Sequence, residues 1–239
     1  NEGMEVFTNT PKVLESRRQN LELILSTHER KCLSCVKSGK CELQKLCLDY
    51  GVTDESIYDG ERIHYDIDDS APHMIRDNNK CVLCRRCSAV CRKWQDVGVI
   101  GANERGFSTH IGCAFEAPLG DSPCVSCGQC LVNCPFGAIA DKSQIFQMIR
   151  AIQAGERVYA AVAPAFVGQF GPKMTPGKLR AAMKRLGFAD IIEVAIGADL
   201  CAAQEAEDFV EEVPEKLPFM ATSCCPAWSM MAKKLFPEA

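Results

Sequence analysis

Two runs of cysteines in this chain repeat the spacing C-x2-C-x2-C-x3-C. Their members are Cys81, Cys84, Cys87, Cys91, Cys124, Cys127, Cys130 and Cys134. Three thiolates on one such loop can hold three corners of a 4Fe–4S cubane, and the fourth thiolate of each run crosses to the other cluster. We therefore predict two clusters, with Cys134 completing the first ligand set and Cys91 the second. One-electron transfer is the first function that this spacing indicates.

A third group combines an imidazole with thiols. His28 precedes Cys32, Cys35 and Cys41 in the spacing H-x3-C-x2-C-x5-C. Three thiolates need a fourth ligand to complete a cubane, and Cys47 competes with His28 for that place. An imidazole in place of a thiolate removes a negative charge and tends to raise the reduction potential of a cluster. We predict a third 4Fe–4S cluster with His28 as the fourth ligand.

The last candidate site is the adjacent pair Cys224 and Cys225 in T-S-C-C-P-A-W, residues 222–228. The pair follows a predicted strand over 217–222 and precedes a helix that begins near Pro226. Ligands bind at the carboxyl edge of open parallel sheets, and helix amides there favour thiolates. The alternative is a pair of buried core cysteines. Adjacent side chains on a turn point in different directions, so we expect the two thiols to have different roles.

Composition narrows the function class. The chain has 239 residues, 16 cysteines and a net charge of −4, which gives no indication of nucleic-acid binding. No apolar run approaches the roughly 20 residues that span a bilayer, and no secretory signal segment is visible. Closely spaced cysteines fit metal sites better than disulfides, and zinc is the stronger rival to iron–sulfur. We expect a reducing cytoplasmic location.

The first half of the chain reads as helices and cysteine loops. Thr10 and Pro11 predict the start of a helix that ends near residue 27, and residues 42–48 predict a short second helix. Residues 51–80 are polar and irregular, and we interpret them as a linker.

The second half alternates strands and helices. Strands are expected over 157–163, 190–195 and 217–222, and helices over 143–155, 175–187 and 199–212. This alternation predicts a parallel sheet with helices on its faces.

The predicted fold is a multi-domain α+β chain. Residues 1–12 are expected to be the tail of an upstream ferredoxin-type domain, and 13–75 a small His/Cys3 iron–sulfur domain with its linker. Residues 76–142 predict a ferredoxin-like domain with two 4Fe–4S clusters, and 143–239 the first part of an α/β domain. Because the chain opens at Asn1 and closes inside a helical pattern, we expect it to be a piece of a longer protein.

These motifs resemble the iron-only (FeFe) hydrogenases. The resemblance rests on H-x3-C-x2-C-x5-C followed by C-E-L-Q-K-L, on N-K-C-V-L-C-R-R-C and C-V-S-C-G-Q-C, on V-A-P-A at 162–165, and on T-S-C-C-P-A-W. The first stretch is shared with the large iron–sulfur subunit of respiratory complex I. Ala227 stands where most members of the family have Gly, which suggests a divergent subgroup. Cys91 is followed by Arg92, whereas Pro135 follows Cys134.

The resemblance implies roles in the active-site H-cluster, which joins a 4Fe–4S part to a diiron part. Cys225 would hold the 4Fe–4S part, Cys224 would exchange protons with the diiron part, and Pro164 would lie near the diiron ligands. Glu205 and Asp208 would continue the proton path, although a solvated acidic face explains them equally well. No further cysteine follows Cys225, so the other H-cluster ligands are expected beyond this segment.

The implied function is reversible reduction of protons to H2, with electrons supplied by ferredoxin or a similar soluble carrier. The family also implies maturation proteins for the diiron site, partner redox subunits, and a 2Fe–2S cluster upstream of Asn1. Three alternatives remain at this point: a non-catalytic relay subunit of the complex I or formate-dehydrogenase-linked kind, a sensor of H2 or redox state, and a cytosolic iron–sulfur assembly factor. Cys47, Cys113 and Cys201 have no assigned role.

Overall fold

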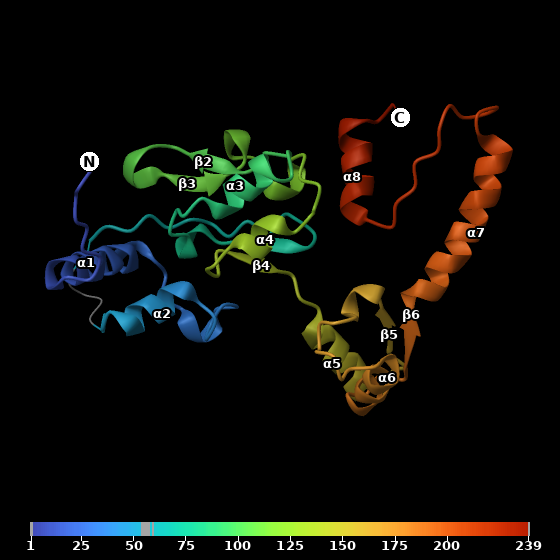
Figure 1. The fold of residues 1–239 in the computed structure, drawn as a ribbon, viewed down its shortest axis with the longest axis horizontal. Coiled ribbons are helices and arrows are strands. Elements are labelled where there is room, and N and C mark those ends of the chain that lie inside the picture. Colours follow the sequence, from blue (N-terminus) through green and yellow to red (C-terminus); the bar gives the residue numbers. More distant parts are fainter. Residues whose placement is uncertain (1, 54–57, 59, 239) are drawn as a thin grey trace. The chain divides into compact units, whose positions relative to one another are not determined.

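The computed structural model describes residues 2–53, 58 and 60–238 (Figure 1). It comprises two compact units, Asn1–Lys142 together with Cys225–Ala239, and Ser143–Cys224. Part of the predicted linker, residues 54–57 and 59, lies outside the described residues. Helices and strands are mixed, as the sequence predicted. Among the described residues, no helix has the length and apolar character needed to cross a bilayer.

The first unit begins with two helices that pack on each other. Helix α1 spans Pro11–Thr27, and the Thr10 hydroxyl accepts a hydrogen bond from the Val13 N–H at 3.3 Å, so the predicted cap is confirmed. Helix α2 spans Glu42–Asp49. Their apolar sides bury a small core, which consists of Leu21, Leu25, Leu43 and Val52. The three cysteines after His28 lie on the connection between these helices.

The part of this unit that carries the two cysteine runs, which the sequence predicts to be ferredoxin-like, is built around a pair of antiparallel strands. Strand β1 (Met74–Arg76) pairs with β4 (Ile139–Asp141), so the two ends of this segment lie side by side. Between them lie α3 (Arg86–Lys93), α4 (Gln129–Asn133) and the hairpin of β2 (Gly101–Asn103) and β3 (His110–Gly112). Met74, Ile111 and Cys113 are the most deeply buried side chains of its core.

The second unit contains one parallel strand pair. Strand β5 (Tyr159–Val162) pairs in register with β6 (Asp190–Glu193), with Tyr159 opposite Asp190. Helices α5 (Ile145–Gln153) and α6 (Pro176–Arg185) precede each strand, and α7 (Val194–Glu212) follows β6 directly. Thr175 caps α6 as predicted, by accepting the Lys178 N–H at 3.3 Å. Helix α7 begins at Val194, earlier than the expected residue 199.

The expected third strand over 217–222 is wrong. The structure assigns no strand to these residues, so the described part of the sheet ends at two strands. A strand is stabilised only by a ladder of hydrogen bonds to a neighbour, and Pro218 has no N–H to contribute to one. Leu217 and Phe219 are accordingly 42% and 56% exposed. The apolar content of this stretch predicted a strand, but it carried no information about a pairing partner.

Helix α8 (Pro226–Leu235) completes the first unit. The Lys234 ammonium donates to the carbonyls of Ser122 and Cys124, at 3.0 and 2.8 Å. These contacts fix the helix after the cysteine pair to the loop that carries the second cysteine run.

Short 3-10 turns are also present among the described residues. They span Cys32–Ser34, Asn78–Lys80, Gly106–Ser108, Ala114–Glu116, Leu119–Asp121 and Pro164–Phe166.

Candidate metal centres

The structure gathers the eight cysteines of the two runs around two separate cavities. One cavity is lined by Cys81, Cys84, Cys87 and Cys134, and the other by Cys91, Cys124, Cys127 and Cys130. The fourth cysteine of each run thus lies with the first three of the other run, which is the crossed arrangement that the spacing predicts. The donor set of each cavity, four thiols among mostly apolar side chains, fits a 4Fe–4S cluster.

The two loops repeat the same backbone geometry. Leu83 and Arg85 have φ angles of 56° and 60°, and the corresponding Ser126 and Gly128 have 60° and 73°. Non-glycine residues adopt this left-handed region only at a cost, of order 1–2 kcal/mol. The Leu83 and Ser126 amides donate to Cys81 Sγ and Cys124 Sγ, at 3.4 and 3.5 Å. These turned amides place N–H groups near each thiol set, where they would stabilise an anionic cluster.

Without metal, burial favours the protonated form of four of these thiols, those of Cys81, Cys87, Cys124 and Cys130. Burial, followed by the neighbouring thiols, raises the pKa of Cys87 to about 11 and that of Cys130 to about 12. Burial also raises the pKa of Cys81, against the hydrogen bond from the Leu83 amide. Because iron binds the thiolate form, assembly of a cluster here must release protons.

The described residues form no group of three His, Cys, Asp or Glu side chains close enough for a single metal ion. No two of the 16 cysteines, all of which lie in the described part, form a disulfide.

The third candidate centre is a cavity of about 680 Å³ between α1 and α2. His28, Cys32, Cys35, Cys41 and Cys47 all line it. Burial lowers the pKa of His28 despite its hydrogen bond to the Lys80 backbone, and its Nδ1 atom is buried without a partner. A neutral imidazole with an orphaned, buried nitrogen is the form that binds a metal. Cys47 also lines the cavity, so it stays a competing fourth ligand, and burial raises its pKa.

The His28 cavity adjoins the ferredoxin-like part through Gly137. A Cβ atom on Gly137 would lie 2.4 Å from Cys35 Sγ, so a larger residue at this position requires the thiol to move. The Glu29 N–H donates to the Asn79 carbonyl at 2.8 Å nearby. Arg86 joins the same two parts by donating to both carboxylate oxygens of Glu42, each at 3.1 Å. The third candidate centre and the first are therefore held in one structural framework.

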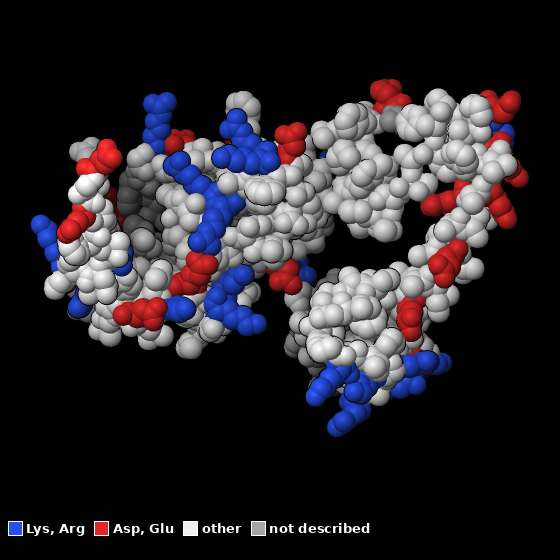
Figure 2. Space-filling view, in the orientation of Figure 1, with Lys and Arg blue, Asp and Glu red and all other residues white. Residues whose placement is uncertain are grey.

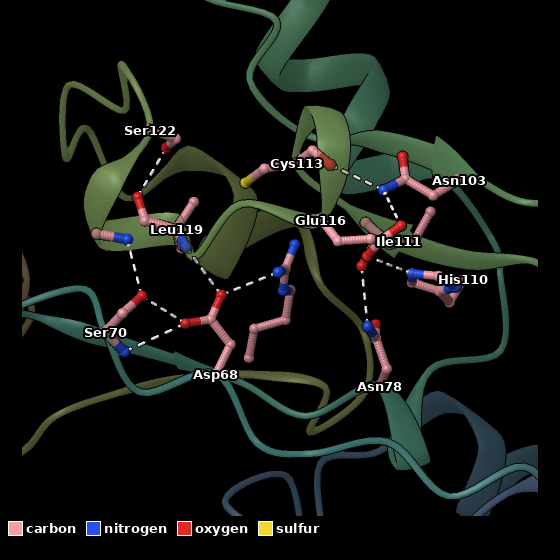
Figure 3. A network of polar contacts seen from close by, with 12 residues as sticks. Asp68, Ser70, Asn78, Asn103, His110, Ile111, Cys113, Glu116, Leu119 and Ser122 are labelled. Carbon is pink, nitrogen blue, oxygen red and sulfur yellow. Dashed lines mark hydrogen bonds and ion pairs between the residues drawn. The ribbon is translucent and has the colours of Figure 1, made fainter.

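A polar network that the sequence did not predict lies beside the first cavity (Figure 3). The Asp68 carboxylate accepts hydrogen bonds from the Ser70 hydroxyl at 2.5 Å, the Leu119 N–H at 3.0 Å and Arg76 Nη2 at 2.9 Å. Burial opposes ionisation of Asp68, but these donors lower its pKa below the ordinary value. Asp68 and Arg76 therefore belong to the first centre's surroundings, although the sequence placed Asp68 in a linker.

His110 lies at the far side of this network. Its Nδ1 faces the Ser108 carbonyl at 3.0 Å and its Nε2 faces Glu116 Oε2 at 2.9 Å, as Figure 3 shows for Glu116. Both partners are acceptors, so both ring nitrogens donate and the imidazolium form is favoured. Burial opposes that charge, but the two hydrogen bonds raise the pKa of His110.

Cys224 and Cys225 are both exposed, so the alternative of a buried core pair is wrong. Cys225 is the N-cap residue of α8 in the first unit, whereas Cys224 closes the second unit. Pro164 follows the carboxyl end of β5 and opens a 3-10 turn. The structure thus places Pro164 at the expected edge of the sheet, and the H-cluster roles of these residues stay predictions.

The predicted carboxylate relay lies on an acidic stretch of α7. Glu205 is exposed, and Asp208 accepts a hydrogen bond from Gln204 Nε2 at 2.9 Å. Figure 2 shows acidic side chains along this helix. The Asp208 contact lies within α7 itself, as expected of a solvated acidic face, and the proton path stays a prediction. Cys201 lies exposed on the same helix, and Cys113 is buried in the ferredoxin-like core.

Comparison with known families agrees with this architecture. Residues 156–239 match the iron only hydrogenase large subunit, C-terminal domain, and residues 17–56 match the NADH-ubiquinone oxidoreductase-G iron-sulfur binding region. The chain is 39% identical to the NADP-reducing hydrogenase subunit HndD of Solidesulfovibrio fructosivorans and 32% identical to iron hydrogenase 1 of Clostridium pasteurianum. Each match covers 99% of this chain and 43% of the relative. The resemblance to iron-only hydrogenases is therefore confirmed.

Part of the chain has a wider set of relatives. It is 29% identical to the NADH-ubiquinone oxidoreductase 75 kDa subunit of Acanthamoeba castellanii, over 60% of this chain and 21% of that protein. The structure is similar to a crystal structure of an NAD+-reducing NiFe-hydrogenase in the H2-reduced state. That similarity has a TM-score of 0.56 and 26% identity, and covers 60% of this chain and 61% of the other. About three fifths of the chain is thus shared among several classes of redox enzyme.

Proposed function

We propose that this chain, an iron–sulfur member of the hydrogenase-like electron-transfer oxidoreductases, forms the electron-relay part and the first portion of the active-site domain of an iron-only hydrogenase. One observation carries the proposal. A single chain joins three cysteine-lined centres to residues 156–239, which match the iron-only hydrogenase C-terminal domain. A relay alone would not require the second region.

In this proposal the three centres each hold a 4Fe–4S cluster, which supplies one-electron transfer when bound. His28, Cys32, Cys35 and Cys41 hold one cluster, and the two crossed thiol sets hold the others. The Leu83 and Ser126 amides, which donate to cysteine sulfurs, would stabilise the charge of the crossed clusters. Electrons enter from ferredoxin, a similar soluble carrier or a partner redox subunit, in a reducing cytoplasm.

The cysteine pair would serve the complete active site, together with ligands that this segment does not contain. Cys225 would hold the 4Fe–4S part of the H-cluster, and Cys224 would give and take the protons of the reaction in which two protons and two electrons form H2. A thiol with an ordinary pKa of about 8.5 can do both near neutral pH when its surroundings tune it. Both thiols are exposed, and Cys225 is the N-cap residue of α8. Maturation proteins would install the diiron part.

The test uses the intact enzyme with its clusters assembled. Cys224→Ala should lower H2 evolution by about 10²–10⁴-fold, the usual contribution of a positioned acid–base group. Iron and sulfide contents should not change. Cys201→Ala is the matched control, since Cys201 is also an exposed cysteine near the acidic stretch. Near-normal H2 evolution by the Cys224 variant would refute the proton role.

A second candidate is supported by a specific observation. Some relatives of this chain are subunits of nucleotide-linked assemblies, and the relative from Solidesulfovibrio fructosivorans is named as a subunit of an NADP-reducing enzyme. The chain would then exchange electrons with a nucleotide-linked partner subunit instead of ferredoxin. Assay of the intact protein with each donor separates the two: activity with ferredoxin alone favours the first, and a requirement for a partner subunit with NADPH favours the second.

A further inference from the structure

Arg76, which forms the end of strand β1, is a buried cation with unused donors. It is 9% exposed, and its Nε and Nη1 atoms are buried without any hydrogen-bond partner. An arginine keeps its charge in proteins and carries five N–H donors. A buried donor without a partner costs about 1–3 kcal/mol, and more when it is charged. These unpaired N–H groups therefore indicate that something else accepts from them.

Arg76 lies at the first cysteine cavity. It lines that cavity together with Cys81, Cys84, Cys87 and Cys134. Burial raises the pKa of Cys81, and the Arg76 charge acts in the opposite direction, as expected when the cation lies in range of the thiol. Apolar side chains make up much of the remaining wall, so they offer no acceptor to the unused donors.

Asp68 holds Arg76 in this position. The two residues are joined by a pair of backbone hydrogen bonds, each 2.9 Å, and by the ion pair from Nη2 to Oδ2. Asp68 is fixed in turn by Ser70 and by the Leu119 N–H (Figure 3). Only one edge of the guanidinium is used by this anchor, so Nε and Nη1 remain for the cavity.

We propose that Arg76 donates N–H···S hydrogen bonds to the cluster held by Cys81, Cys84, Cys87 and Cys134, and so raises its reduction potential above that of the same cluster without this cation. The inference rests on the proposed function, because it requires the cluster. The cluster gains one electron from its donor on reduction, and no bond of the guanidinium breaks. Hydrogen bonds to sulfur and nearby positive charge both favour the reduced, more negative cluster.

The test is a redox titration of the complete chain, with clusters assembled anaerobically and monitored by EPR. Arg76→Met should shift the reduction equilibrium of one couple by at least about tenfold, which is about 59 mV for a one-electron couple, toward the oxidised form. Cys84→Ser changes a ligand of that cluster and so identifies its signal. Arg86→Met is the matched control. Arg86 also lies near Cys84 and Cys134, but it is exposed and paired with Glu42, so its loss should change the same couple far less.

The remaining outcomes separate this inference from the proposed function. A loaded Arg76→Met chain with the native potential would overturn the inference alone. Should that variant not assemble the cluster, Arg76→Gln retains an amide donor without the charge, and its couple should lie below the native one. The inference would be overturned if Arg76→Gln kept the native potential. It would also be overturned if neither Arg76 variant assembled the cluster while Arg86→Met did, because Arg76 would then serve folding. Absence of iron–sulfur clusters from the unchanged chain would refute the proposed function itself.

Discussion

Replacement of Gly137 by Ala tests whether the His28 centre is a cluster site fitted against the ferredoxin-like part. The added methyl group would lie 2.4 Å from Cys35 Sγ, with Lys80 Cδ and Val36 Cγ2 at ordinary contact distances of 3.7 and 3.8 Å. In the metal-free chain Cys35 can rotate its thiol away at little cost. Once Cys35 binds a cluster, its sulfur is fixed, and the clash must be relieved by moving the backbone or the cluster.

The size of the effect follows from the cost of the clash in the loaded state. Overpacking by one methyl group costs about 1–3 kcal/mol, and this cost falls on the loaded chain, where the Cys35 sulfur is fixed. Since 1.4 kcal/mol corresponds to a factor of ten, retention of this cluster should fall by roughly 5- to 140-fold. The less flexible unfolded chain of the alanine variant stabilises the loaded and metal-free folded chains equally, by about 0.4–1 kcal/mol, and so does not change retention.

The assay challenges loaded chains with an iron chelator and follows each cluster by EPR. Gly101→Ala is the matched control, because a Cβ atom there meets nothing within 4 Å and its backbone is not in the left-handed region. The Gly137 variant should lose the His28-type signal first and keep the other two. Equal retention of all three signals in both variants would show that Gly137 is not needed to fit Cys35 and its cluster.

Three further predictions concern other parts of the first unit. His28→Cys should keep its cluster but lower its reduction potential, because a thiolate adds negative charge; an unchanged or higher potential in a redox titration would contradict His28 as a ligand. Lys234→Met removes two hydrogen bonds to carbonyls, worth about 1.5 kcal/mol together, so the rate of amide hydrogen exchange across α8 should rise about tenfold. The control Lys233→Met should leave the rate unchanged. Equal exchange rates in both variants would show that Lys234 does not hold α8 in place. The pKa of His110 is raised and that of Glu116 is lowered, so their pairing stabilises the fold fully between about pH 4.5 and 6.5. This stability is lost as the pH rises through the folded pKa of His110, or falls through that of Glu116. Thermal unfolding should show this pH dependence in the native chain and not in His110→Gln.

Local sequence signals predicted the local structure well. Thr10 and Thr175, each followed by proline, marked helix starts that the structure confirms. The C-x2-C-x2-C spacing predicted which three thiols of each run share a cavity, because such short loops allow their sulfurs few directions. These predictions depend on neighbours in the sequence, whose geometry the backbone largely determines. The crossing of Cys91 and Cys134 was predicted from the pattern of two-cluster ferredoxins.

Features that depend on distant partners were not predictable. Residues 217–222 have the apolar character of a strand, but a strand requires a pairing partner, and composition does not supply one. Asp68 and Arg76 read as parts of a polar linker, yet their pairing buries a cation beside the first cysteine cavity. An acidic residue in an irregular stretch is usually solvated, so only the fold could distinguish this one. The position of Arg76 in the sequence did offer one indication of its place near the cluster site. It lies five residues before Cys81, directly before the D-N-N-K stretch that leads into that cysteine.

The central claim is that thiols and one imidazole of this chain hold three 4Fe–4S clusters. The most direct measurement is the iron, acid-labile sulfide and zinc content of the anaerobically purified and reconstituted chain. The account predicts about 12 iron and about 12 sulfide per chain, from three cubanes, with a brown chromophore and negligible zinc. Colourless protein with stoichiometric zinc and no sulfide would contradict it.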